Sequence, residues 1–149
     1  LPLEISSAFA LEQLKKFPKF SALRKKHFAD LYKFFKKYSR FFILPKQTPN
    51  TTTCWLAFPL IIKKGSPFSR LDIVRFLENA NIQTRPVFTG NILKQPGFKR
   101  IHHRLAQKSF PNTEYIMKNA LVVACHQGMS STQVNYLKKK FEEFLDQFK

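Results

Sequence analysis

The chain has 149 residues, of which 44% are apolar and 15% aromatic, enough for one folded domain with its own core. Its formal net charge of +17 favours an anionic partner such as nucleic acid or a membrane surface. The basic residues recur in small groups inside amphipathic segments, however, and that is typical of solvated helix faces. No apolar run reaches the ~18 residues of a membrane-spanning helix, and no signal-peptide pattern opens the chain. We expect a cytoplasmic protein with no membrane contact and no specific nucleic-acid partner.

Apolar side chains between Ile5 and Leu14 keep helical spacing, and Pro18 interrupts the pattern. A second helical pattern, rich in Phe, then continues to Tyr38. We predict helices over residues 4–15 and 19–39 that meet at a kink. The Phe stripe indicates a core or an interface rather than a cofactor site.

Residues 45–53 predict a loop that leads into a strand over residues 54–62, where Pro59 favours an edge position or a bulge. Ser69 and Asp72 form a capping-box pattern that opens a helix ending near Asn79. A short strand over residues 82–84 is expected next.

The final third of the chain predicts a helix over residues 112–119, a buried strand over residues 120–124 and a last helix. Ser130 and Gln133 form the capping box of that last helix. The predicted fold is α/β (α+β), a small sandwich in which helices pack on a few-stranded, mainly antiparallel sheet.

Residues 84–98 contain two prolines, two glycines, Arg85 and Asn91 in one irregular segment. Gly90 and Gly97 permit backbone angles that other residues avoid, whereas the prolines fix φ. Ordered loops of this kind often carry binding groups. An ordinary connection between a strand and a helix is the alternative interpretation.

Residue patterns alone define no active site. Cys54 and Cys125 lie far apart without CxxC or Cys/His spacing, so neither a metal site nor a firm disulfide is predicted. No phosphate loop, nucleophile elbow or HExxH helix is present in the sequence. His126 follows the buried strand and could reach a site, although a structural role is the simpler interpretation.

Three segments of the chain carry a family resemblance: residues 3–16, residues 84–98, and residues 111–114 with the following strand. Together they resemble the C-terminal third of the DegT family of pyridoxal-phosphate (PLP) sugar aminotransferases and dehydratases. The loop sequence Thr-Arg-Pro-Val-Phe-Thr-Gly-Asn, followed by Gln95 and Pro96, is most similar to the branch that removes the 3-hydroxyl of a nucleotide-linked 4-keto-6-deoxyhexose in deoxysugar and lipopolysaccharide O-antigen biosynthesis. An aminotransferase of the same family is the alternative.

The resemblance implies that residues 1–149 form the small C-terminal domain of a fold-type I PLP enzyme, with a helical connector over residues 1–40 and a sandwich over residues 54–149. The large cofactor domain, which binds PLP or pyridoxamine phosphate (PMP), would lie upstream, and the intact parent would be a homodimer. Because the chain opens at Leu1 without methionine, we expect a processed protein or a fragment. Alone, it should bind no cofactor and turn over no substrate.

The resemblance also implies substrate-binding residues, but no catalytic ones. Arg85 and Asn91 would contact the sugar nucleotide, Gly90 would allow close backbone approach, and Phe88 would form an apolar wall. Gln95 and His126 are weaker candidates. A basic nucleic-acid-binding module is a competing interpretation, and steeply salt-dependent binding would favour it. The helical spacing of most Phe residues predicts burial instead of an exposed stacking platform.

Overall fold

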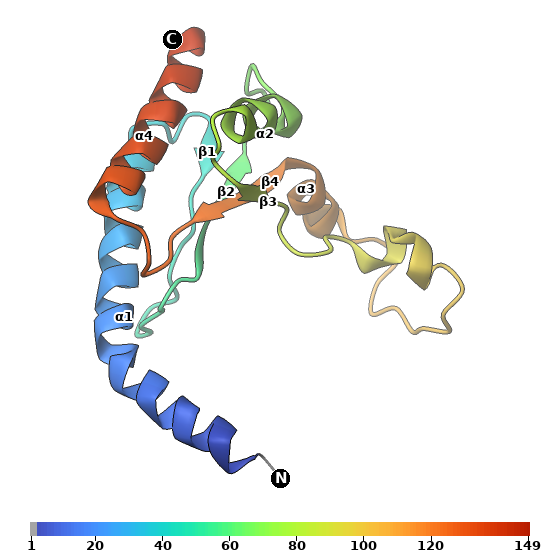
Figure 1. Cartoon of the computed structure of the whole chain (residues 1–149). Helices are drawn as coiled ribbons and strands as arrows, with labels where there is room; N and C mark the ends of the chain where they lie inside the picture. The colour runs from blue at the N-terminus through green and yellow to red at the C-terminus, as the bar shows by residue number, and fades with distance from the viewer. Residues whose placement is uncertain (1–2) are drawn as a thin grey trace.

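The computed structural model describes residues 3–149, so Leu1 and Pro2, on which the expectation of a fragment rests, lie outside the described residues. In chain order the main elements are α1 (Glu4–Lys36), β1 (Phe42–Ile43), β2 (Ala57–Ile62), α2 (Arg70–Asn79), β3 (Thr84–Arg85), α3 (Pro111–Asn119), β4 (Ala120–Ala124) and α4 (Ser131–Leu145). Three 3-10 turns, η1 (Ile92–Lys94), η2 (Pro96–Phe98) and η3 (Asp146–Phe148), complete the order. Figure 1 shows α1 and α4 side by side along the sheet and the segment between β3 and α3 extending away from it.

The sheet has the order β1-β2-β4-β3, and every neighbouring pair is antiparallel. Along β2, Phe58, Leu60 and Ile62 are buried and alternate with half-buried residues, as expected for a strand that presents one face to a core. Core residues from α1, α2 and α4 join them in one cluster. The predicted α+β fold is therefore confirmed.

Pro18 bends α1 but does not end it, so the prediction of two separate helices is wrong. Proline removes one helical hydrogen bond and crowds the preceding turn. The residues on either side favour helix strongly enough for the helix to continue through the bend, which Figure 1 shows.

Both predicted capping boxes are present. In the first, Ser69 N–H donates to Asp72 Oδ2 at 2.8 Å and Asp72 N–H donates to Ser69 Oγ at 3.3 Å. In the second, Ser130 N–H donates to Gln133 Oε1 at 2.8 Å and Gln133 N–H donates to Ser130 Oγ at 3.2 Å. These reciprocal bonds satisfy amide groups that a helix start leaves free.

The strand predictions need three corrections. β1 was not predicted, because two residues are too short to show a pattern. β2 begins at Ala57 rather than at residue 54. Ile82 lies in the turn that follows α2, where its N–H donates to the Leu77 carbonyl at 2.9 Å, so β3 begins only at Thr84.

Pro59 lies in an inner strand of the sheet order, and β2 is therefore not an edge strand. β1 pairs only with Ile61 and Ile62, however. The β1 side of β2 is thus unpaired at Pro59, and the missing N–H of the proline breaks no bond to β1.

The first half of α1, together with its N-cap residue Leu3, exposes a group of apolar side chains on several faces of the helix. In Figure 1 this half extends past the sheet. The exposed residues are Leu3, Ile5, Phe9, Leu11, Leu14 and Phe17. Apolar surface of this kind marks a contact site or an aggregation-prone face.

We predict that the chain self-associates through these exposed apolar side chains of α1. Sedimentation velocity at rising concentration should show a species larger than a monomer, because association would remove the apolar side chains from water. The double variant Phe9→Gln/Leu14→Gln should shift the distribution toward monomer. Leu71→Gln, which alters an exposed leucine of α2, should leave it unchanged. A wild-type chain that stays monomeric at high concentration would refute the prediction.

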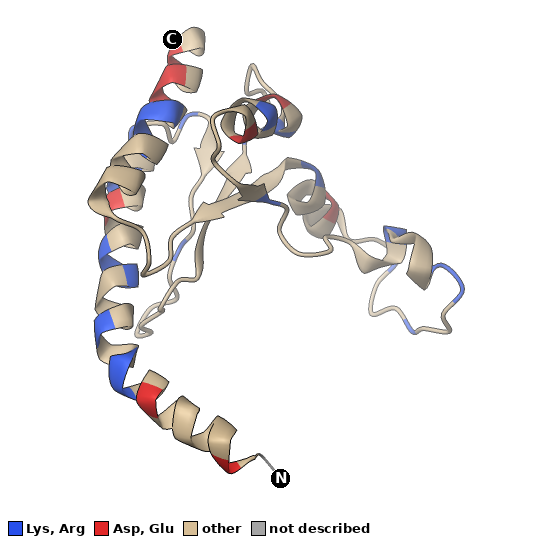
Figure 2. Cartoon of the chain, viewed as in Figure 1, with Lys and Arg blue, Asp and Glu red and all other residues tan. Residues whose placement is uncertain are grey.

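Charge is distributed over several elements. Figure 2 shows Lys and Arg along the middle of α1, on α4 and in the loop after η2, whereas the first turns of α1 carry acidic and uncharged residues. Within residues 3–149, no helix combines the length and the apolarity required to cross a membrane.

Candidate functional site

The 84–98 loop is built around Asn91, which is only 5% exposed. Its Oδ1 accepts a hydrogen bond from Leu93 N–H at 3.1 Å and so caps η1. Gln95 ties the loop to itself by donating from Nε2 to the Thr89 carbonyl at 2.6 Å. These bonds give the loop a defined shape without a ligand.

Gly90 seats the loop against α3. Its φ is +64°, in the left-handed region, and a Cβ atom there would lie 2.5 Å from Met117 Cγ. The next amide, Asn91 N–H, points at Met117 Sδ at 3.4 Å. Gly90 thus meets a conformational and a steric requirement at once. Gly97 has neither a positive φ nor a neighbour that would clash, so the special backbone angle expected for it is absent.

Phe88 lies at the tip of this loop in an unusual state. The residue is 92% exposed, and its φ is +48°, which is uncommon for a residue with a bulky side chain. Strained, exposed residues of this type cluster at ligand-binding segments.

Glu78 holds the start of the loop in place. Its Oε1 accepts hydrogen bonds from Thr84 N–H at 2.6 Å and from Thr84 Oγ1 at 2.8 Å. The backbone bond is the largest cause that lowers the pKa of Glu78, with the hydroxyl next and Arg85 adding a weaker effect. An acidic residue of α2 therefore fixes the strand that carries Arg85.

We predict that this anchor weakens in acid. The pKa of Glu78 is depressed in the folded state, so its contribution to stability is present above the ordinary glutamate value of about 4.3 and is lost as pH falls through the lower folded value. Urea midpoints of wild type and Glu78→Gln should therefore differ near neutral pH and converge in acid. If the urea midpoints of the two proteins, plotted against pH, stay the same distance apart from about pH 6 to pH 3, the anchoring role of ionised Glu78 is refuted.

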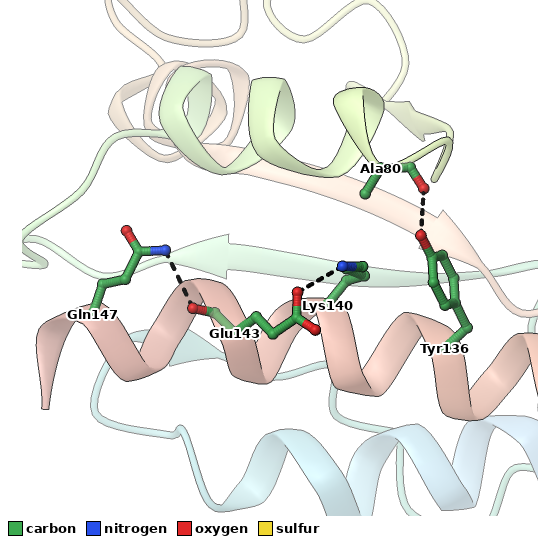
Figure 3. A network of polar contacts seen from close by, with 5 residues as sticks. All are labelled: Ala80, Tyr136, Lys140, Glu143 and Gln147. Atoms are coloured by element: carbon green, nitrogen blue, oxygen red, sulfur yellow. Dashed lines mark hydrogen bonds and ion pairs between the residues drawn. The ribbon is translucent and has the colours of Figure 1, made fainter.

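A cavity of about 390 Å³ lies where β3 and β4 meet the start of α4. Arg85 and His126 both line it, although they are far apart in sequence. Tyr136 forms part of its wall, and its hydroxyl donates to the Ala80 carbonyl at 3.0 Å, joining α4 to the end of α2 (Figure 3). We call this the Arg85 cavity; its other lining residues are Ala57, Asn81, Ile82, Gln83, Val122, Val123, Ala124, Met129, Gln133 and Leu137.

The six predicted substrate-binding residues do not line one common site; they line three separate hollows of the surface. Arg85 and His126 share the Arg85 cavity. Phe88, Gly90 and Gln95 line a smaller hollow of about 150 Å³. Asn91 and Gly90 border another hollow of about 320 Å³. Their roles in substrate binding remain predictions.

Sequence patterns missed Glu78, Met117 and Tyr136, which position these groups. Glu78 and Tyr136 occupy ordinary helical positions, and only the folded chain brings them to Thr84 and Ala80. The Gly90–Met117 contact likewise joins residues with no local sequence signal.

Cys125 precedes His126, but it does not form a reactive pair with it. The thiol is buried, and burial raises its pKa to about 11. It is therefore protonated at neutral pH and is a poor nucleophile.

The order of the elements and the 84–98 loop can be compared with known proteins. A model of the DegT/DnrJ/EryC1/StrS aminotransferase family matches residues 3–142. The chain belongs to this family. The resemblance inferred from three sequence segments is thus confirmed over nearly the whole chain.

Among curated DegT-family relatives, the lipopolysaccharide biosynthesis protein RfbH of Salmonella typhimurium is 31% identical over 141 residues, which are 95% of this chain and 32% of RfbH. Among solved structures, GDP-4-keto-6-deoxy-D-mannose-3-dehydratase of E. coli with bound hydrated PLP is 34% identical, with a TM-score of 0.78, over 93% of this chain and 35% of that one. The chain thus spans about a third of the length of these DegT-family relatives.

An aminotransferase from Psychrobacter cryohalolentis superposes equally well. Its TM-score is 0.80 over 91% of this chain and 36% of that one, but its identity is only 12%. This likeness concerns the fold alone. The DegT-family fold therefore does not separate dehydratases from aminotransferases.

Proposed function

We propose that the chain is the small C-terminal domain of a PMP- or PLP-dependent 3-dehydratase that acts on a nucleotide-linked 4-keto-6-deoxyhexose. The pathway would be deoxysugar and lipopolysaccharide O-antigen biosynthesis. One contrast supports the dehydratase branch best. The chain is 34% identical to the E. coli dehydratase but 12% identical to the aminotransferase, at nearly equal TM-scores. Function follows the site rather than the fold, so the sequence difference carries more weight.

The residues of this chain do not fit the cofactor by themselves. A PLP site ordinarily supplies a lysine at the cofactor carbon and an acidic or basic partner for the ring nitrogen. In some dehydratases of this family, as the resemblance implies, histidine replaces that lysine. His126 and Arg85 do line the Arg85 cavity, but its lining holds no lysine to bond the cofactor carbon and no carboxylate to pair with the ring nitrogen. We therefore assign cofactor binding to a lobe outside these 149 residues.

In this proposal the loop and the Arg85 cavity contact the sugar nucleotide. Arg85 is exposed and forms none of the ion pairs found in residues 3–149, so its guanidinium is free to bind oxygen atoms of a substrate. Phe88 offers an exposed apolar ring beside Gly90 and Gln95. Asn91 would act through its Nδ2, because its Oδ1 already caps η1.

The exposed half of α1 would pack on the cofactor lobe. Burial of its exposed apolar side chains gives that contact a driving force. The same surface drives the self-association predicted above, so the lobe and a second copy of the chain would compete for it.

A chimera tests the proposed function. Residues 3–142 would replace the matching third of the E. coli dehydratase, and the product from GDP-4-keto-6-deoxymannose would be analysed by mass spectrometry with glutamate present. We expect a product that has lost the C3 oxygen. The unmodified E. coli enzyme is the positive control.

Other products would change the assignment. Because the E. coli lobe supplies the cofactor site, a sugar that keeps its C3 oxygen and gains nitrogen at C4 would show that this domain shifts the reaction toward that of an aminotransferase. A chimera that folds and binds PLP but yields neither product would reject both assignments.

A further inference from the structure

The polar residues that line the Arg85 cavity include several hydrogen-bond donors and no carboxylate. Arg85 supplies a guanidinium, which only donates. No Asp or Glu lines the cavity. Glu78 is close enough for its pKa to respond to Arg85, but none of the ion pairs found in residues 3–149 joins the two side chains. The positive charge of Arg85 is therefore not neutralised by an ion pair.

His126 adds a second donor because its tautomer is fixed. Gly128 N–H donates to His126 Nδ1 at 3.1 Å, so Nδ1 carries no proton. The proton of the neutral ring must then be on Nε2, which becomes a donor. No intramolecular acceptor for Nε2 is found among residues 3–149.

Gln133 adds a third donor for a similar reason. Its Oε1 accepts from Ser130 N–H in the capping box of α4, which leaves the Nε2 amide to donate. The cavity also adjoins the first turn of α4, where the helix dipole is positive. Tyr136 donates to Ala80, and Asn81 and Gln83 can either donate or accept.

We infer that the Arg85 cavity binds an oxyanion, held by Arg85, His126 and Gln133. Three donors from separate elements and no lining carboxylate match a phosphate or carboxylate group and oppose a cation. The volume of about 390 Å³ is within the range of small-ligand sites. The anion could come from the diphosphate of a nucleotide sugar or from the carboxylate of an amino donor. Only the choice between these sources rests on the proposed function.

Nuclear magnetic resonance of the 149-residue chain tests the inference without an activity assay. The ¹⁵N-labelled protein would be titrated separately with pyrophosphate, GDP and glutamate at fixed, near-physiological salt. We expect saturable shifts at the amides of Gly128, Ser130 and Gln133. Stronger binding of pyrophosphate and GDP would identify the diphosphate as the source, and stronger binding of glutamate would identify the carboxylate.

Gln133→Glu is the decisive variant. Glutamate at this position preserves the capping box, so the helix should remain as stable, but it removes a donor and adds a negative charge to the cavity. We expect the dissociation constant for the anion that binds the wild-type chain to rise at least about tenfold, as for loss of one charged hydrogen bond. Arg85→Gln should raise this constant similarly.

Arg100→Gln is the matched control for charge, because Arg100 is exposed and lies outside the cavity lining. The affinity of the Arg100→Gln variant for each anion should equal that of the wild-type chain. Absence of saturable binding for every probe would overturn the inference. Equal weakening by Arg100→Gln and Arg85→Gln would also overturn it, because binding would then follow net charge alone. Neither outcome bears on the product of the chimera, so the two proposals can fail separately.

Discussion

Replacing Gly90 by alanine should destabilise the fold by about 2 to 4 kcal/mol, the combined effect of backbone strain and overpacking. The new Cβ would lie 2.5 Å from Met117 Cγ, and the backbone would keep a φ of +64°. Either the loop or α3 must therefore move. Urea unfolding measures the change in free energy, and the amide shifts of residues 84–98 show whether the loop moves.

Gly65→Ala separates strain from crowding. Gly65 has a φ of +86°, but a Cβ atom added there would meet no heavy atom within 4 Å, so only strain of about 1 kcal/mol is expected. Met117→Ala combined with Gly90→Ala should cost less than the two single changes added together, because it removes the contacts with Cγ at 2.5 Å and Sδ at 3.1 Å and leaves only the contact with Cβ at 2.7 Å. Equal costs at Gly65 and Gly90 would show that the Met117 contact does not matter.

Replacing Phe35 by alanine should cost about 3 to 5 kcal/mol. The ring is fully buried where α1, the sheet and α4 meet. It packs edge-on against Phe141 with centroids 4.7 Å apart and stacks on Phe58 at 5.2 Å. Its loss would leave a cavity that these rings cannot easily fill. Chemical unfolding with an unchanged m-value measures the effect.

Phe9→Ala is the control for the Phe35 prediction. Phe9 lies on the same helix but is 66% exposed, so its loss should change the stability of the monomer little. Measurements should be made at a concentration where the chain is monomeric. Comparable costs at Phe35 and Phe9 would contradict the assigned core.

Sequence patterns predicted the elements that have strong local signals. The two capping boxes located the starts of α2 and α4, and the apolar run of β4 matched its structural bounds. Predictions failed where tertiary contacts decide. Pro18 was expected to end a helix, and β1 is too short to leave a pattern.

The candidate site shows a similar division. The composition of the 84–98 loop identified Arg85 and Gly90, because proline, glycine and a lone arginine stand out in a sequence. The meeting of Arg85 with His126 in one cavity follows from the pairing of β3 with β4. The capping bond of Gln133 was predicted from the sequence, but its position in the lining of the same cavity as Arg85 depends on the fold.

The central claim is that Arg85 and its cavity face the substrate of a sugar-nucleotide dehydratase. Its most direct test is kcat/KM for GDP-4-keto-6-deoxymannose in the active chimera, with Arg85→Gln compared against Arg100→Gln. We predict that Arg85→Gln lowers kcat/KM at least about tenfold, as expected for one lost charged hydrogen bond, while Arg100→Gln leaves it unchanged. Equal kcat/KM values for the two variants would contradict the claim.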